Sequence, residues 1–412
     1  MGKVLALMLA AGCVISSYAT DARVVVMGRD DAFYRDEVSI FTNPATVNLY
    51  PNMVYGSFGV YQQREGDRSS ALNRFNRDAE RPFFGAIISN RFTEQDEASL
   101  ISFAAVFNRH DRMLDYITPV KTFDANGNVA STHMPVAFPD NSSNVNLESP
   151  VGRVDLIGSY TLRNGVSIGA GLYLAHQRVT ENNNIDFESG VYKGTLGILS
   201  PVGPGLELEA SVNAGLLTGI GTIDDNELTI ADRDWFIRGD LRSFASVPAI
   251  NGAVVPQASF NLVNLQDGET RLIDFAAGLG LNMNIDRGFF FAGLQGLYTR
   301  NDWHEFDSEE SYGARVSFGV ERNLVWDWFV LRVGGQKVVR YATNGPNSGR
   351  WIENPEADGS DEDLVGLGFG VNIEDRFRVD FVAAEDLAYT FTNLFSGPQH
   401  HLFKRVSATY RF

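Results

Sequence analysis

The sequence has very little cysteine and few basic residues. Cys13 is the only cysteine among 412 residues, and it lies in an N-terminal segment that we expect to be removed. The mature chain is therefore expected to form no disulfide and to offer no thiol for catalysis. Lys and Arg number 34 against 51 Asp and Glu, which gives a net charge of −17. Because nucleic acid attracts cationic surfaces, this balance argues against a nucleic-acid partner.

Long hydrophobic runs are also lacking after the N-terminus. Residues 1–19 contain a basic start, an apolar core over 4–15 and a small residue at Ala19. This pattern predicts a signal peptide cleaved after Ala19, since a single-span anchor needs about 20 apolar residues. The residues before Cys13 leave a lipoprotein signal open as an alternative. The expected division of the chain is a signal peptide (1–19), an N-terminal plug segment (20–52) and a β-barrel (53–412).

What the sequence does contain is alternation of apolar and polar residues at a period of two. At the C-terminus, Tyr410 and Phe412 lie on one face of such a segment, and Thr409 and Arg411 lie on the other. A period of two indicates β-strands, and no long stretch has a helical period. The pattern predicts fourteen strands, at 53–61, 82–92, 98–109, 153–163, 165–178, 190–200, 206–220, 270–285, 288–303, 311–321, 328–343, 363–374, 377–386 and 401–412.

The connections between these strands add a second pattern. Those after even-numbered strands are short, those after odd-numbered strands are longer, and two, 110–152 and 221–269, are very long. Short turns at one end and long loops at the other are typical of outer-membrane barrels. The sequence therefore predicts an all-β fold, a 14-stranded antiparallel transmembrane outer-membrane β-barrel with a small N-terminal plug. A soluble β-sandwich or two tandem β-domains would explain the alternation but not the loop lengths.

The segment before the first strand carries Asn43-Pro44-Ala45, in which the proline disfavours helix at the preceding residue. This stretch resembles the N-terminal plug of the long-chain fatty-acid transporter family, and related barrels occur in type IX secretion. The resemblance implies fourteen strands, a plug in the lumen and external loops that gather hydrophobic substrate. In some family members substrate leaves sideways at a kinked third strand. Because 98–109 has no Gly or Pro to force a kink, lateral exit is not expected here.

Four groups of residues are candidates for function. The first is the plug motif, and the second is a set of lumen charges at Asp274, Arg315, Arg332 and Arg405. Tyr410 and Phe412 resemble the terminal aromatic signal that the barrel-assembly machinery reads in outer-membrane proteins. Apolar residues in the two long loops form the fourth group, a candidate ligand-gathering surface: Met134, Phe138, Phe236, Leu241, Phe244 and Phe260.

These features predict a bacterial outer-membrane protein for passive uptake of hydrophobic small molecules. Its expected partners are outer-membrane lipid, the assembly machinery and a hydrophobic small molecule. No catalytic set, metal site or cofactor is predicted, so we do not expect an enzyme. Two alternatives stay open: a structural or type IX secretion-associated barrel that binds protein partners at its rim, and a porin for polar solutes.

Overall fold

The computed structural model describes most of the chain after the expected signal peptide. The described residues are 21–28, 31–59, 82–91, 99–117, 120–123, 129–133, 150–181, 185–223, 226–302, 308–324, 326–345, 348–352, 364–374, 376–383 and 403–412. The expected signal peptide lies outside them, as do Met134 and Phe138. In these ranges no helix is long and apolar enough to cross a membrane.

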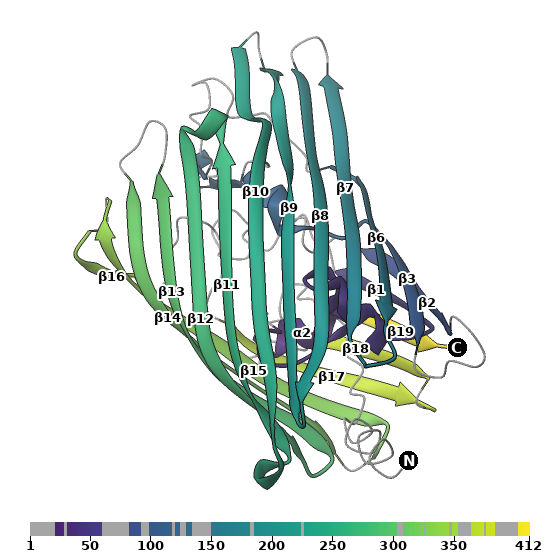
Figure 1. Ribbon diagram of the computed structural model, residues 1–412. Coiled ribbons are helices and arrows are strands. Elements are labelled where there is room, and N and C mark those ends of the chain that lie inside the picture. The colour runs from purple at the N-terminus through teal and green to yellow at the C-terminus, as the bar shows by residue number, and fades with distance from the viewer. Residues whose placement is uncertain are drawn as a thin grey trace, which may run out of the picture.

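The main body is a closed antiparallel β-barrel of sixteen strands (Figure 1). Each strand pairs with its neighbours in the chain, and β1 pairs with both β2 and β19, which closes the cylinder. The strands are β1 (Met53–Gly59), β2 (Phe83–Arg91), β3 (Leu100–Phe107), β6 (Gly152–Thr161), β7 (Ser167–Glu181), β8 (Ile185–Gly203), β9 (Leu206–Ile223), β10 (Asn226–Val247), β11 (Gly252–Leu265), β12 (Thr270–Ile285), β13 (Gly288–Asp302), β14 (Glu309–Asn323), β15 (Phe329–Asn344), β17 (Leu364–Ile373), β18 (Phe377–Ala383) and β19 (Phe403–Arg411). A short strand, β16 (Arg350–Ile352), pairs with β15.

The predicted number of fourteen strands is wrong, because 221–269 is not a loop. It contains β10 and β11, which pair with each other and with the strands on either side. Simple alternation is lost in β10 because two β-bulges interrupt its pairing with β9, one at Thr229/Ala231 and one at Asp232/Asp234. Its lumen-facing side also mixes aromatic and charged side chains, and β11 contains Pro256. The apolar content that suggested a ligand-binding loop therefore belongs to the barrel wall.

The two faces of the wall differ as a membrane barrel requires. On β8, Lys193 and Thr195 are buried inside, whereas Tyr192 and Leu196 point outward, and Leu196 is 61% exposed. Phe103 on β3, Leu279 on β12 and many other outward residues repeat this pattern. A belt of large exposed apolar side chains would promote aggregation in water, and it is stable when hydrocarbon surrounds it. The wall is thus built to face lipid.

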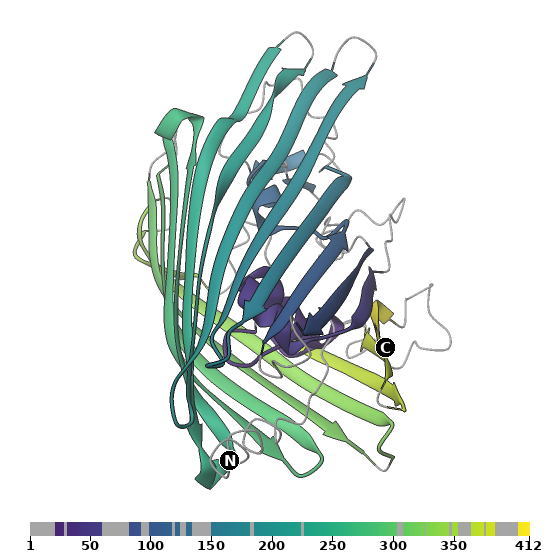
Figure 2. The ribbon, with the colours of Figure 1, turned by 45° about the vertical axis from the view of Figure 1, so that its right-hand side comes forward.

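The wall is much taller on one side than on the other. β8 and β10 have 19 and 22 residues, whereas β1 and β18 have 7 each. A tilted strand of about 9–11 residues crosses a membrane. The strands from β7 to β10, of 15 to 22 residues, therefore extend beyond the lipid at the upper end of the barrel in Figures 1 and 2.

The N-terminal segment lies inside the barrel, drawn in purple in Figure 2. It contains α2 (Asp21–Val26) and two 3₁₀ turns, η1 (Glu37–Phe41) and η2 (Pro44–Leu49). α2 contacts β15, β17, β18 and β19, whereas η2 contacts β3, β6, β7 and β8. The other short elements are η5 (Arg112–Tyr116), the hairpin β4 (Val120–Phe123) and β5 (Val129–His133), η7 (Pro248–Ile250) and η8 (Gln266–Gly268).

Candidate functional site

The Asn43-Pro44-Ala45 motif fixes the plug to the wall. The Asn43 side chain accepts a hydrogen bond from the Ala45 N–H (3.1 Å) and so caps η2. Its amide donates to the carbonyl of Ile198 on β8 (3.0 Å). Pro44 begins η2, where its missing N–H costs nothing. The motif therefore starts a helical turn and ties it to the lumen surface.

Glycines in the wall allow the plug to come this close. A Cβ added at Gly197 would lie 2.0 Å from the Asn43 Oδ1, and one at Gly169 would lie 2.3 Å from the Ala45 nitrogen. Both distances are far below van der Waals contact. Five other glycines meet Phe33 or Val26 of the plug in the same way, and we call all seven the plug-contact glycines: Gly169, Gly197, Gly280, Gly293, Gly334, Gly366 and Gly368.

A buried ionic network joins the plug to the opposite part of the wall. Arg23 of α2 pairs with Asp36 of the plug (3.2 Å) and with Glu321 of β14 (3.0 Å). Arg332 and Arg378 complete the network on the wall, where each contacts Glu321 and Asp380. Every side chain in it is at most 7% exposed. Buried charges are stable only when they are paired, so removing one partner is costly.

Two acidic groups of the plug have raised pKa values. Burial raises the pKa of Asp36 to about 7, although the charge of Arg23 acts in the opposite direction. Burial and the neighbouring Asp36 raise the pKa of Glu37 well above its ordinary value. Asp36 caps η1 and pairs with Arg23 of the plug, whereas Glu37 on η1 accepts from Thr409 on β19 (3.5 Å). The charge of this part of the plug therefore depends on pH.

Further ion pairs hold the plug at other points. Arg35 pairs with Glu207 (2.6 Å) and Glu209 of β9, and Arg242 of β10 pairs with Glu209 (2.7 Å). Arg242 also donates to the Asp31 carbonyl (2.6 Å). The plug is thus anchored on several sides of the lumen.

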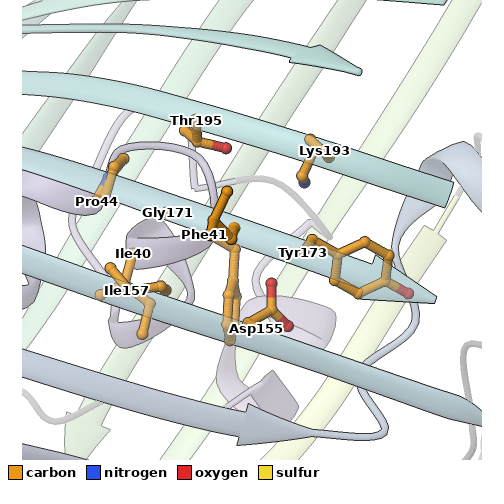
Figure 3. A pocket seen from close by; sticks show the side chains of 10 residues that line it. Ile40, Phe41, Pro44, Asp155, Ile157, Gly171, Tyr173, Lys193 and Thr195 are labelled. Carbon is orange, nitrogen blue, oxygen red and sulfur yellow. The ribbon is translucent and has the colours of Figure 1, made fainter. Parts of the chain in front are cut away.

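A small cavity lies between the plug and the strands β6, β7 and β8 (Figure 3). In the view of Figure 3, Phe41 stands between the aliphatic side chains of Ile40 and Ile157 and the ring of Tyr173. The space has room for about one water molecule. Its lining residues are Ile40, Phe41, Pro44, Asp155, Ile157, Gly171, Leu172, Tyr173, Lys193 and Thr195.

Charged residues close one end of this cavity. Arg109 pairs with Asp155 (2.8 Å) and with Asp111 (2.9 Å), and Lys193 also pairs with Asp111. The Arg109 guanidinium lies 4.2 Å from the centroid of the Phe41 ring, a cation–π contact between wall and plug. The charges satisfy one another, so apolar and ionic surfaces meet without an unpaired group.

A second segment fills the lumen above the plug. Asp111 caps η5 by accepting from the Met113 N–H (3.1 Å). Behind this cap, η5 packs against inward-facing side chains of β7 to β12. Together they form what we call the upper apolar cluster: Met113, Leu114, Ile117, Tyr173, Ala175, Val191, Leu217, Ala231, Phe236, Val263, Leu265 and Leu272.

The predicted ligand-gathering residues within the described ranges are not in a loop. Phe236 and Phe244 lie on β10 and face the lumen, where they are 1% and 9% exposed. Leu241 on β10 and Phe260 on β11 face outward, with exposures of 48% and 44%. The four residues therefore belong to two opposite surfaces and do not form one ligand surface.

The four predicted lumen charges all have partners. Asp274 accepts from Asn261 (3.3 Å) and Thr299 (3.2 Å), and the Arg315 side chain lies 3.5 Å from the Gln295 Oε1. Arg332 belongs to the buried network, and Arg405 pairs with Asp21 of the plug.

The two predicted assembly residues lie at the end of the last strand. Tyr410 and Phe412 are 45% and 61% exposed on the outer side. The Phe412 N–H donates to the Asn52 carbonyl (3.1 Å).

Sequence reasoning did not identify Arg109, Asp111, Tyr173 or Lys193. Tyr173 and Lys193 stand on the lumen-facing side of strands that were predicted correctly, among glycine and small polar residues. A large or charged side chain among such small residues could have marked Tyr173 and Lys193 as candidate site residues. Arg109 ends the predicted strand 98–109 and Asp111 lies in the predicted loop 110–152, and nothing in their spacing connects them with β8.

No family model matches the chain, and no curated protein matches it. Similar solved structures include the toluene transporter TodX of Pseudomonas putida, at 11% identity over 96% of this chain and 98% of that one, with a TM-score of 0.38. CdiB from Acinetobacter baumannii matches at 10% identity over 88% of this chain and 59% of its own, with a TM-score of 0.42. The outer membrane protein OmpT of Vibrio cholerae matches at 7% identity over 88% and 96%, with a TM-score of 0.36. All three are outer-membrane β-barrels, and the likeness is too distant to assign a function.

Proposed function

We propose that this chain is a bacterial outer-membrane barrel for passive uptake of hydrophobic small molecules. The observation that carries the proposal is apolar surface inside the lumen. The upper apolar cluster reaches the cavity at Tyr173. On the other side of the cavity, Ile40 and Ile157 belong to a second buried apolar cluster, which also contains Val47, Tyr50, Met53, Tyr55, Phe83, Ile87, Ala104 and Val106.

A hydrophobic molecule would cross the barrel by transfer from one apolar surface of the lumen to the next. A ligand would leave water at the upper cluster, pass the cavity and emerge along the second cluster. Burial of apolar area drives the first step, at about 25 cal/mol per Å². The cavity holds about one water molecule, so a ligand passes only if the plug or η5 moves. No covalent chemistry is involved.

The two alternatives make different demands on the structure. A porin for polar solutes needs a wet, open lumen. Here the plug contacts wall glycines closely and pairs its charges with the wall. A barrel that binds protein partners at its rim would use the part of β7 to β10 that extends above the lipid, and such partners would co-purify with it.

Uptake of an apolar dye by intact cells tests the proposal. Cells that make the protein should take up 1-N-phenylnaphthylamine several times faster than host cells without it. Gly171→Leu should reduce this gain at least fivefold, because the side chain fills the cavity; an added Cβ there meets its nearest neighbours at 3.7 Å. Gly194→Leu is the matched control, since Gly194 is exposed and pairs with Leu172 beside it.

Two outcomes would contradict the proposal. One is dye uptake no faster than in host cells although a heat-modifiable band on a denaturing gel shows a folded barrel. The other is high ion conductance of the intact protein in planar bilayers, which would favour the porin.

A further inference from the structure

The upper apolar cluster is unusual for the inside of a barrel. Inward positions of water-filled barrels are polar. Here a group of upper inward positions on successive strands from β7 to β12 is apolar, beside inward polar residues such as Asp234 and Asn261. The wall residues of this surface, which we call the upper basin, are Tyr173, Ala175, Val191, Leu217, Ala231, Phe236, Val263, Leu265 and Leu272. None of them carries a charge at neutral pH.

The chain itself occupies this basin. Met113, Leu114 and Ile117 of the η5 segment are 3%, 0% and 0% exposed, so their side chains are buried, and they belong to one cluster with the basin residues. η5 is a single turn of five residues. Such a short turn has little stability of its own, so the contacts with the basin hold it in place.

Ionic contacts fix one end of this segment, and Asn261 of β11 donates a hydrogen bond to the Tyr116 hydroxyl at the other end (3.1 Å). Asp111 caps η5 and pairs with Arg109 and Lys193 at the border of the cavity. From there the three apolar side chains enter the basin. Tyr173 belongs to both the basin and the cavity, so the two spaces adjoin.

We propose that the upper basin is a binding site for an uncharged, apolar small molecule and that Met113, Leu114 and Ile117 occupy it as a built-in competitor. The proposal rests on the proposed uptake function. A charged ligand group would lose its hydration in the basin without gaining a partner, because the charges at the cavity border pair with one another. The Asp234 carboxylate, which lies opposite Leu217, accepts hydrogen bonds from the backbone N–H groups of Gln266 and Asp267. A macromolecule is too large to reach a surface inside the barrel below η5. A ligand gains the site by displacing the three side chains, and this opens the way to the cavity.

A disulfide that locks η5 in the basin tests the competitor directly. A Cβ added at Gly219 on β9 would lie 3.6 Å from the Ile117 Cβ, within the range for a disulfide. The Ile117→Cys/Gly219→Cys variant is made with Cys13→Ser, which removes the only native cysteine. The two single-cysteine variants, oxidised in the same way, are the controls.

Dye uptake by intact cells is measured before and after reduction. We expect the oxidised double variant to lose at least nine-tenths of the wild-type gain and to recover it on reduction, whereas both controls keep it. Recovery on reduction also shows that the variant is folded. Equal uptake by the oxidised and reduced forms would overturn the proposal, because the route would then bypass the basin. Wild-type uptake no faster than in host cells would instead reject the proposed function.

Weakening the competitor gives a second, opposite test. Leu114→Ala should raise dye uptake at low dye concentration two- to fivefold, because the ligand then displaces a smaller apolar group. Leu196→Ala is the matched control, since Leu196 is 61% exposed on the outer face of β8. Lower uptake with Leu114→Ala, in protein that still shows the heat-modifiable band, would contradict the competitor role.

Discussion

At the scale of single residues, glycine decides how closely the plug meets the wall. The plug-contact glycines leave no space for a methyl group, because an added Cβ would overlap plug atoms at each of them. Close packing of this kind tolerates few changes in volume. The wall glycines and the plug residues therefore form one matched surface, although they are far apart in sequence.

Gly197→Ala should loosen the plug. The new methyl group would collide with the Asn43 side chain, so both the cap of η2 and the bond to Ile198 would be lost. These losses amount to about 1–3 kcal/mol, or roughly a five- to hundredfold rise in the undocked fraction. The rate at which trypsin cleaves after Arg23 in reconstituted protein measures that fraction, since Arg23 is buried in the docked plug.

Gly194→Ala provides the control for this measurement. It lies on the same strand but faces outward, and its added Cβ would have only the Ala214 carbonyl oxygen nearby, at 3.9 Å. Equal cleavage rates in the two variants would show that the contact at Gly197 does not hold the plug.

The site residues that sequence predicted are those with a local signature. Asn43 precedes a proline and caps the next turn, and this follows from a few neighbouring residues. Its wall partners, Gly197 and Ile198, follow only from the barrel, which places β8 beside η2. The ion pair between Asp111 and Lys193 likewise follows only from the arrangement of the strands in the barrel. Contacts across the lumen depend on strand number and register, which a single sequence does not specify.

At the scale of elements, strand prediction failed where the wall is irregular. The other fourteen strands each overlap a predicted span, because their outer faces are apolar and their inner faces polar or small. β10 has the inward aromatic residues Phe236 and Phe244, which contact η5 and the plug. β11 has the buried aliphatic residues Val255, Val263 and Leu265. Their inner face is therefore as apolar as the outer one in places. The inward apolar residues that contact η5 and the plug therefore explain why β10 and β11 do not show a simple alternation of apolar and polar residues.

The seating of the plug should depend on pH. The pKa of Asp36 is raised to about 7 and that of Glu37 is raised well above its ordinary value, so the docked plug binds more protons than an undocked one. Docking is then strongest below the ordinary carboxyl pKa of about 4 and weakens as pH rises through 7. Ion conductance of the protein in planar bilayers should accordingly rise several-fold between pH 5 and pH 8.

Glu37→Gln should flatten this pH dependence, because glutamine stays uncharged across the range. The wall groups Arg378 and Asp380, which influence Glu37, are unchanged in this variant. Conductance that is higher at pH 5 than at pH 8 would contradict the assigned direction.

At the scale of the whole molecule, closure of the barrel depends on its two ends. β1 and β19 pair from Met53 opposite Arg411 to Gly59 opposite Arg405. β1 follows the plug directly, so the last strand also seals the lumen around it; Arg405 of β19 contacts Asp21 of the plug. The seam of the barrel and one anchor of the plug therefore share the strand β19.

Phe412 allows an assembly role to be separated from a structural one. Its side chain is 61% exposed on the outer face, and its contribution to the seam is a single N–H bond to Asn52. If Phe412 acts as the assembly signal predicted from the sequence, Phe412→Ala should leave refolding from urea into lipid vesicles unchanged, while the amount of heat-modifiable barrel in cells falls several-fold. Phe377→Ala is the matched control, since Phe377 is outward-facing and pairs with Tyr410 on β19. Slower refolding of Phe412→Ala in vesicles would assign the residue to the stability of the seam instead.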